Sequence, residues 1–167
     1  KSTFLNVSGG TLGGDIYAGA LKAATVLENT NITISGGAVN GDIYGGGGRA
    51  DTVVKGNSNI TLVGSTAKIS GTIYGGGKDG GVVEGVKTLN IGTAGEAYNG
   101  TLKVRDFNAI NIQNKSAATI GGDISNQVVE GRSLAKISGE SDLTVDGAEF
   151  SKNQATSSSN LTGALLL

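Results

Sequence analysis

A seven-residue motif that recurs along the chain constrains its fold more than any other feature. The motif reads GDIYGGG at Gly41–Gly47, GDIYAGA at Gly14–Ala20 and GTIYGGG at Gly71–Gly77. Its copies begin 27 and 30 residues apart. Self-similarity at a fixed period of roughly 20 to 50 residues is typical of solenoids and repeat arrays. We therefore expect one structural unit per repeat, with successive units stacked along one axis.

A short block of alternating residues accompanies the repeats. Each copy reads apolar, polar, apolar, with Thr or Asn at the centre, which is the pattern of a half-buried strand. We expect all copies to stack in one column, with the apolar residues inward and Thr or Asn outward. The six copies are Leu5–Val7, Ile32–Ile34, Ile60–Leu62, Leu89–Ile91, Ile110–Ile112 and Leu143–Val145.

A column of glycines stands at the entrance to a second strand. Each glycine precedes an apolar residue by two positions, so a backbone bend that a side chain would obstruct is expected there. The glycines are Gly14, Gly41, Gly71, Gly100 and Gly122, and the apolar residues are Ile16, Ile43, Ile73, Leu102 and Ile124.

A third, weaker strand completes the repeat at Val26–Glu28, Val53–Lys55 and Val82–Glu84, and it returns at Val128–Glu130. Three strands joined by corners form one rung of a coil, and stacked rungs lie about 4.8 Å apart. The chain is therefore expected to be an all-β protein, a right-handed single-stranded parallel β-helix (β-solenoid) of about five or six rungs.

One rung departs from this pattern. Leu102 and Ile110 are eight residues apart, whereas Ile16 and Ile32 are sixteen apart. We therefore expect a shortened rung near residues 100–112, without a third strand, where the coil narrows or bends. Residues 1–150 are assigned to the β-helix, with an insertion at Arg132–Glu140. Residues 151–167 are a polar segment followed by an apolar end, which is either a cap or the start of a further rung.

Composition excludes several classes of function. The 167 residues include 30 glycines but no proline, cysteine or histidine, so Ser-His-Asp and Cys-His triads and the usual zinc sites are absent. The net charge is −1 and the basic residues are scattered, which argues against nucleic acid as a partner. The sequence also has no long apolar run, so no membrane contact is expected. We expect no catalytic residues, no metal and no cofactor.

Three tyrosines, Tyr17, Tyr44 and Tyr74, occupy one position of the repeat. Each follows an inward isoleucine, so alternation turns the tyrosines outward into a ladder on one face. Such a ladder can contact a glycan or a protein. Stacking between rungs explains the same pattern without a ligand. Both interpretations stay open at this point.

Two columns of charged residues follow the same periodicity. Glu28, Lys55 and Glu84 alternate in sign, which indicates control of strand register. Asp15, Asp42 and Asp123 share another column, and neighbouring carboxylates can bind calcium or act as an acid/base pair. No calcium-binding nonapeptide and no cluster of carboxylates with Arg or Lys accompanies them, so hydrolase or lyase activity is not the first expectation.

With its rungs aligned, the chain resembles the passenger domains of bacterial autotransporters and related large surface adhesins. The resemblance lies in the strands NITISG and SNITLVG and in the corners DIYGGG and TIYGGG, and it extends over about Thr3–Val145. It implies a parallel β-helix that is exported across a bacterial outer membrane by a translocator outside this sequence. No active-site motif of the family maps onto these residues.

The sequence therefore predicts a structural and adhesive module of a secreted or cell-surface protein, with a host or bacterial surface glycan or protein as partner. One alternative is a fragment of a carbohydrate-active β-helix, related to polysaccharide lyases or hydrolases. Another is a module that associates with itself through its faces or open ends.

Overall fold

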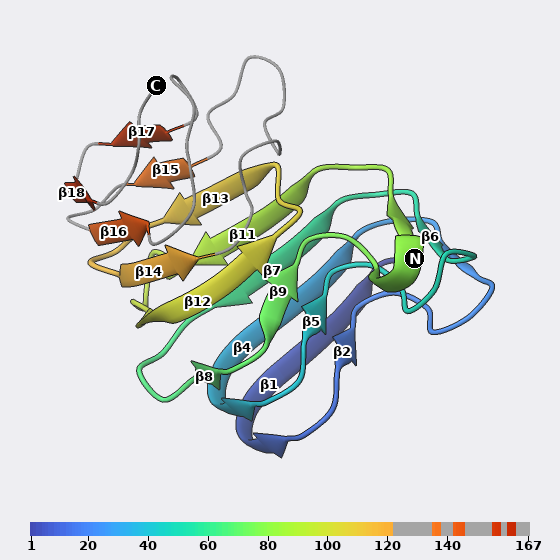
Figure 1. The fold of residues 1–167 in the computed structure, drawn as a ribbon, viewed down its shortest axis with the longest axis horizontal. Coiled ribbons are helices and arrows are strands. Elements are labelled where there is room, and N and C mark those ends of the chain that lie inside the picture. Colours follow the sequence, from blue (N-terminus) through green and yellow to red (C-terminus); the bar gives the residue numbers. More distant parts are fainter. Residues whose placement is uncertain (122–134, 138–141, 146–154, 158–159, 163–167) are drawn as a thin grey trace.

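The computed structural model describes residues 1–121, 135–137, 142–145, 155–157 and 160–162. These residues form a parallel β-solenoid, which confirms the predicted fold class (Figure 1). Each strand pairs in parallel with the corresponding strand of the next coil, and the strands fall into three sheets. In Figure 1, sheet A and sheet B run side by side from the blue amino-terminal strands to the red carboxy-terminal ones.

The three sheets contain all the described strands. Sheet A runs in the order β1 (Thr3–Leu12), β4 (Thr30–Val39), β7 (Ser58–Leu62), β11 (Lys87–Ile91), β13 (Ala109–Ile112), β15 (Ala135–Ile137) and β17 (Ala155–Ser157), and β8 (Lys68–Ile69) pairs with β4. Sheet B runs in the order β2 (Ile16–Tyr17), β5 (Ile43–Tyr44), β9 (Thr72–Tyr74), β12 (Asn99–Arg105), β14 (Ala117–Gly121), β16 (Asp142–Val145) and β18 (Asn160–Thr162). Sheet C consists of β3 (Thr25–Val26), β6 (Val53–Val54) and β10 (Val82–Val83).

The first five alternating blocks stack in register along sheet A, as predicted. Leu5 pairs with Ile32, Ile32 with Ile60, Ile60 with Leu89, and Leu89 with Ile110. From Ile32 onward these side chains are at most 1% exposed. Each one lies over the equivalent side chain of the previous coil, so the interior is a continuous apolar column.

The sixth block was assigned to the wrong sheet. Leu143–Val145 lies in β16 of sheet B, where it pairs with Ala118–Ile120. The sheet A strand of that coil is β15, which falls inside the segment predicted to be an insertion. Both sheets bury alternate residues, so an apolar, polar, apolar triplet does not distinguish one sheet from the other once the coil is shortened.

The second-strand column is right for three coils and wrong after them. Ile16, Ile43 and Ile73 pair in register, but Ile73 then pairs with Val104 instead of Leu102. Leu102 pairs with Ile120. A shift of two residues keeps the same side chains inward, so the alternation alone did not reveal it. Gly100 therefore lies within β12 and not at a corner, while Gly122 and Ile124 lie outside the described residues.

The glycines at the entrance to sheet B are required by close backbone contact. A Cβ built on Gly41 would lie 2.4 Å from the carbonyl carbon of Gly14, and one built on Gly71 would lie 2.1 Å from the carbonyl oxygen of Gly41. Gly14 itself has no atom within 4 Å of its Cβ position. The obstruction therefore comes from the preceding coil and not from the bend alone.

Four further glycines, not predicted from the sequence, occur one per coil where the backbone adopts a positive φ after the alternating block of sheet A. Gly10, Gly37, Gly64 and Gly92 have φ between 79° and 85°, a region that favours glycine. In the next coil Asn114 adopts a φ of 58°, and asparagine is one of the residues that tolerate this region best.

The shortened coil is confirmed. Sheet C ends at β10 among the described strands, and β12 is followed directly by β13 of sheet A. Among the third strands, Val53–Val54 pairs with Val82–Val83 in the predicted register, but the first strand is shifted by one residue, because Val26 pairs with Val54 and not with Val53. Val128–Glu130 lies outside the described residues.

Two described strands fall in the segment that was set apart after residue 150. β17 pairs with β15 and β18 pairs with β16, so the ladders of sheets A and B continue into this segment. The terminal leucines, Leu165–Leu167, lie outside the described residues.

We predict that Gly71→Ala destabilises the protein much more than Gly14→Ala. The new methyl group at residue 71 would overlap the backbone of the preceding coil, at a cost of about 1 to 3 kcal/mol. The urea midpoint of the two variants measures the difference. Equal midpoints for Gly71→Ala and Gly14→Ala would contradict the close contact.

Candidate functional site

Tyr17, Tyr44 and Tyr74 lie over one another on sheet B, as the sequence predicted. The ring centroids of Tyr17 and Tyr44 are 5.2 Å apart with an interplanar angle of 10°. Those of Tyr44 and Tyr74 are 4.7 Å apart with an angle of 6°. These distances are those of stacked aromatic rings, so the ladder links three coils through its side chains.

The column of aspartates holds this ladder and the corner beside it. Asp15 accepts a hydrogen bond from the Tyr17 hydroxyl at 3.0 Å and from the backbone N–H of Asp42 at 2.9 Å. Asp42 accepts from the Tyr44 hydroxyl at 3.3 Å and from the backbone N–H of Thr72 at 2.7 Å. Each carboxylate therefore satisfies a backbone donor of the next coil, which is a structural use of the column. Asp123 lies outside the described residues.

Lys78 adds a positive charge to the same cluster. Its Nζ lies 2.9 Å from the Asp15 carboxylate and 3.3 Å from the Tyr17 hydroxyl, and 5.7 Å from the centroid of the Tyr44 ring. The hydrogen bond from Lys78, together with that from the Asp42 N–H, lowers the pKa of Asp15. In turn the bond to Asp15 raises the pKa of Lys78. Burial, with the nearby Asp42 carboxylate, raises the pKa of Tyr44 to about 12.

The stack limits what the tyrosines can offer a ligand. Tyr44 is only 6% exposed, and both of its ring faces lie against neighbouring tyrosines. A sugar ring stacks on a free aromatic face, so the central ring presents only its edge. Beyond Tyr74 the column continues to Arg105, and not to Lys103 as the predicted register implied. A ligand-binding role for these three residues stays a prediction, and the geometry gives them a clear structural one.

The second charged column forms ion pairs in part. Lys55 and Glu84 form a salt bridge across neighbouring coils, in agreement with a role in register. Glu28 instead contacts the amino group of Lys1 and accepts a hydrogen bond from Ser2.

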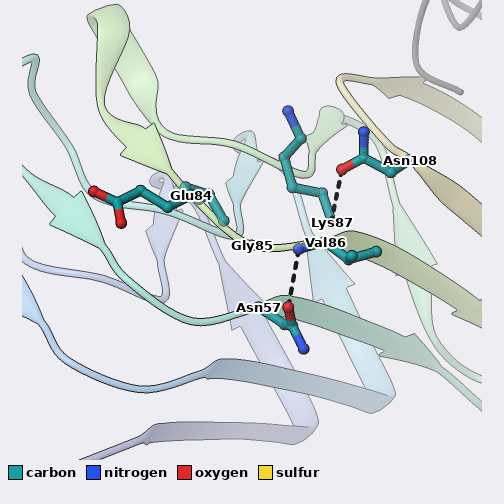
Figure 2. Close-up of a pocket in the computed structure, with 7 residues that line it drawn as sticks. Asn57, Glu84, Gly85, Val86, Lys87 and Asn108 are labelled. Carbon is teal, nitrogen blue, oxygen red and sulfur yellow. Dashed lines mark hydrogen bonds between the residues drawn. The ribbon is translucent and has the colours of Figure 1, made fainter. Parts of the chain in front are cut away.

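An open depression of about 420 Å³ lies at the corner between β10 and β11, where the next coil lacks its third strand. Figure 2 shows residues that line it and the two asparagine side chains that hydrogen-bond to the main chain there. Asn57 accepts a hydrogen bond from the Val86 N–H at 2.9 Å, and Asn108 accepts one from the Lys87 N–H at 3.0 Å. The charged groups at its rim are already paired, Glu84 with Lys55 and Lys87 with Asp106. The depression therefore has the features of a structural step more than those of a reaction centre.

The outer surface of sheet A carries a second set of side chains that align in register. The central column consists of Asn6, Thr33, Thr61, Asn90 and Asn111, and it continues in β15 at Lys136. A flanking column consists of Phe4, Asn31, Asn59, Thr88 and Ala109. We call these ten residues the asparagine–threonine face. The sequence analysis found the outward polar positions but did not recognise the second column, which the same alternation could have revealed.

Comparisons of the chain with protein-family models, with curated proteins and with solved structures found no match. Across the described residues, no helix has the length and apolar character needed to cross a membrane. The same part of the chain contains no group of three or more acidic side chains placed to hold a metal ion.

We predict that the stability contributed by the Asp15 carboxylate depends on pH. Its pKa in the folded state lies below the ordinary aspartate value of 3.8, so this contribution is present at neutral pH and is lost as the pH falls below that value. Asp15→Asn should lower the urea midpoint at pH 7, and the deficit should shrink toward pH 2. A deficit of the same size at both pH values would contradict the assignment.

We predict that Tyr44→Ala costs more stability than Tyr17→Ala, although both remove the same side chain. Tyr44→Ala removes two stacking contacts, whereas Tyr17→Ala removes one. Each stacked pair contributes about 0.5 to 1.5 kcal/mol of stability beyond that of the buried area. Equilibrium unfolding in urea, followed by circular dichroism, measures the difference. If Tyr17→Ala were the more destabilising change, the ladder would not be continuous.

Proposed function

We propose that this chain is a structural and adhesive module of a secreted or cell-surface bacterial β-helix protein. The observation that carries the proposal is the alignment of side chains from coil to coil on the outer surfaces of sheets A and B. The depression at the β10–β11 corner, by contrast, is open, and the charged groups at its rim are already paired. Such a surface suits repeated weak contacts with a glycan or protein on a host or bacterial surface.

The chemistry of the clustered residues supports an adhesive role over a catalytic one. The two described carboxylates of the aspartate column accept backbone N–H groups of the next coil and tyrosine hydroxyls. A general acid or base must reach a substrate proton, and these carboxylates are occupied by structural donors. The runner-up is a carbohydrate-active β-helix, for which the cluster of Asp15, Tyr17 and Lys78 supplies an acidic and a basic group side by side.

The physical properties of the coil fit a protein that is exported before it folds. The chain contains no cysteine, so no disulfide has to form, and each coil pairs with the coil before it. A solenoid of this kind can fold by propagation from one coil to the next. Outward side chains contribute little to the core, so they can carry binding without loss of the fold.

We predict that beads coated with the full chain adhere to immobilised cells, matrix or polysaccharide, and that the chain releases no product from polysaccharides. Adhesion is counted under flow against beads coated with an unrelated protein of similar charge. Release of reducing ends or unsaturated sugars is measured on a polysaccharide panel with and without calcium. Product release would support the carbohydrate-active alternative. Adhesion no stronger than the control on every surface would overturn the proposal.

A further inference from the structure

We propose that the asparagine–threonine face of sheet A is a binding surface for a neutral, extended polysaccharide whose chain lies across the strands. This inference rests on the proposed adhesive function and assigns it to one surface and one class of ligand. The surface belongs to β1, β4, β7, β11 and β13, five consecutive strands of sheet A (Figure 1).

The ten positions of this face carry no charged side chain, and the first charge in the central column is Lys136, one coil beyond Asn111. The chain has 13 basic and 14 acidic residues, yet the ten positions of the face hold five asparagines, three threonines, one phenylalanine and one alanine. On the outer surface of sheet B, by contrast, β12 presents Lys103 and Arg105. A surface of amides and hydroxyls without charge has no electrostatic preference for an anionic or cationic partner, and it matches the hydroxyl groups of a neutral sugar.

Hydrogen bonds hold several amide side chains of this face in fixed orientations. Asn59 donates to the side-chain oxygen of Asn31 at 3.1 Å, and Asn111 donates to that of Asn90 at 2.9 Å. Asn31 in turn donates to the carbonyl oxygen of Thr3 at 3.1 Å. Each of these bonds fixes the orientation of an amide and uses one of its two N–H groups. The second N–H is a donor for a ligand, held in place before binding.

The spacing of the face also matches a sugar chain. In the central column an amide or hydroxyl side chain recurs at each of the five coils. Neighbouring coils lie about 4.8 Å apart, so five strands span about 19 Å from the first to the last. One pyranose residue of an extended β-linked polysaccharide has a comparable length. Phe4 lies in the flanking column and is 82% exposed, so its ring is accessible to a sugar, unlike that of Tyr44.

A second copy of the chain is a poorer occupant of this face. Sheets that pack face to face do so through apolar side chains, and the centres of stable protein interfaces are depleted in polar groups. Among the ten residues only Phe4 is large and apolar, and it lies at one end. The face therefore lacks the apolar centre that sheet-to-sheet association needs.

The test compares two matched pairs of substitutions in the full chain. Thr33→Lys with Thr61→Lys places two positive charges on neighbouring coils of the proposed face, and Thr101→Lys with Thr119→Lys does the same on sheet B. Depletion from suspensions of cellulose, chitin and insoluble β-1,3-glucan measures binding, and flexible α-linked dextran and anionic polygalacturonate serve as comparison ligands. Circular dichroism and urea unfolding check that each variant is folded.

We expect the parent chain to bind at least one of the three insoluble neutral polysaccharides. The Thr33/Thr61 pair should reduce this binding at least tenfold, while the Thr101/Thr119 pair should change it less than twofold. Phe4→Ala, which removes only an exposed ring, should reduce it at least threefold and decides the test if the first pair is unfolded.

Binding by the parent that the Thr33/Thr61 pair and Phe4→Ala leave unchanged would overturn this inference, and so would preferential binding to polygalacturonate. A concentration-dependent mass in light scattering that only the Thr33/Thr61 pair abolishes would assign the face to self-association instead. If coated beads carrying these substitutions still adhere, the proposed adhesive function would hold but the assignment to the asparagine–threonine face would be wrong. If beads coated with the parent chain adhere to no surface, both the adhesive function and this assignment would be wrong.

Discussion

The hydrogen-bond ladder between the backbones of successive coils is the interaction on which the rest of this structure depends. Because every sheet is parallel and in register, each residue lies over its counterpart one coil away. The sequence contains no proline, in agreement with this ladder, because proline has no backbone N–H to donate to the neighbouring coil. The close approach of Gly41 to Gly14 and of Gly71 to Gly41 follows from the same spacing. Small residues at these corners are therefore a consequence of the ladder.

The ladder also organises the side chains. Inside the coil it produces an unbroken apolar column, and outside it produces stacked tyrosines, paired charges and hydrogen-bonded asparagines. Asp15 and Asp42 link the backbone ladder to the tyrosine stack. Their carboxylates accept hydrogen bonds from backbone N–H groups of the next coil and from tyrosine hydroxyls of their own coil. Groups that would suggest catalysis in another setting are here part of the framework. What is left for function is the flat outer surface.

The sequence was sufficient to predict the fold class and the register of the first coils. Period and alternation are strong signals where coils have equal lengths, as for Ile16, Ile43 and Ile73. The signals failed from the shortened coil onward, where Leu102 and Leu143–Val145 were placed in the wrong columns. A shift of two residues preserves the alternation, and only the pairing partners in space distinguish the alternatives. For the same reason the tyrosine ladder was predictable, but the covering of its ring faces required the distances between rings.

The most direct measurement of the central claim is the distance between spin labels on Asn6 and Asn111. The chain has no cysteine, so two introduced cysteines label these sites alone. The two residues occupy one column of sheet A and are four coils apart in register. The account predicts a narrow distribution with a backbone separation of about 19 Å. A broad distribution, or a separation well above about 30 Å, would contradict stacked coils.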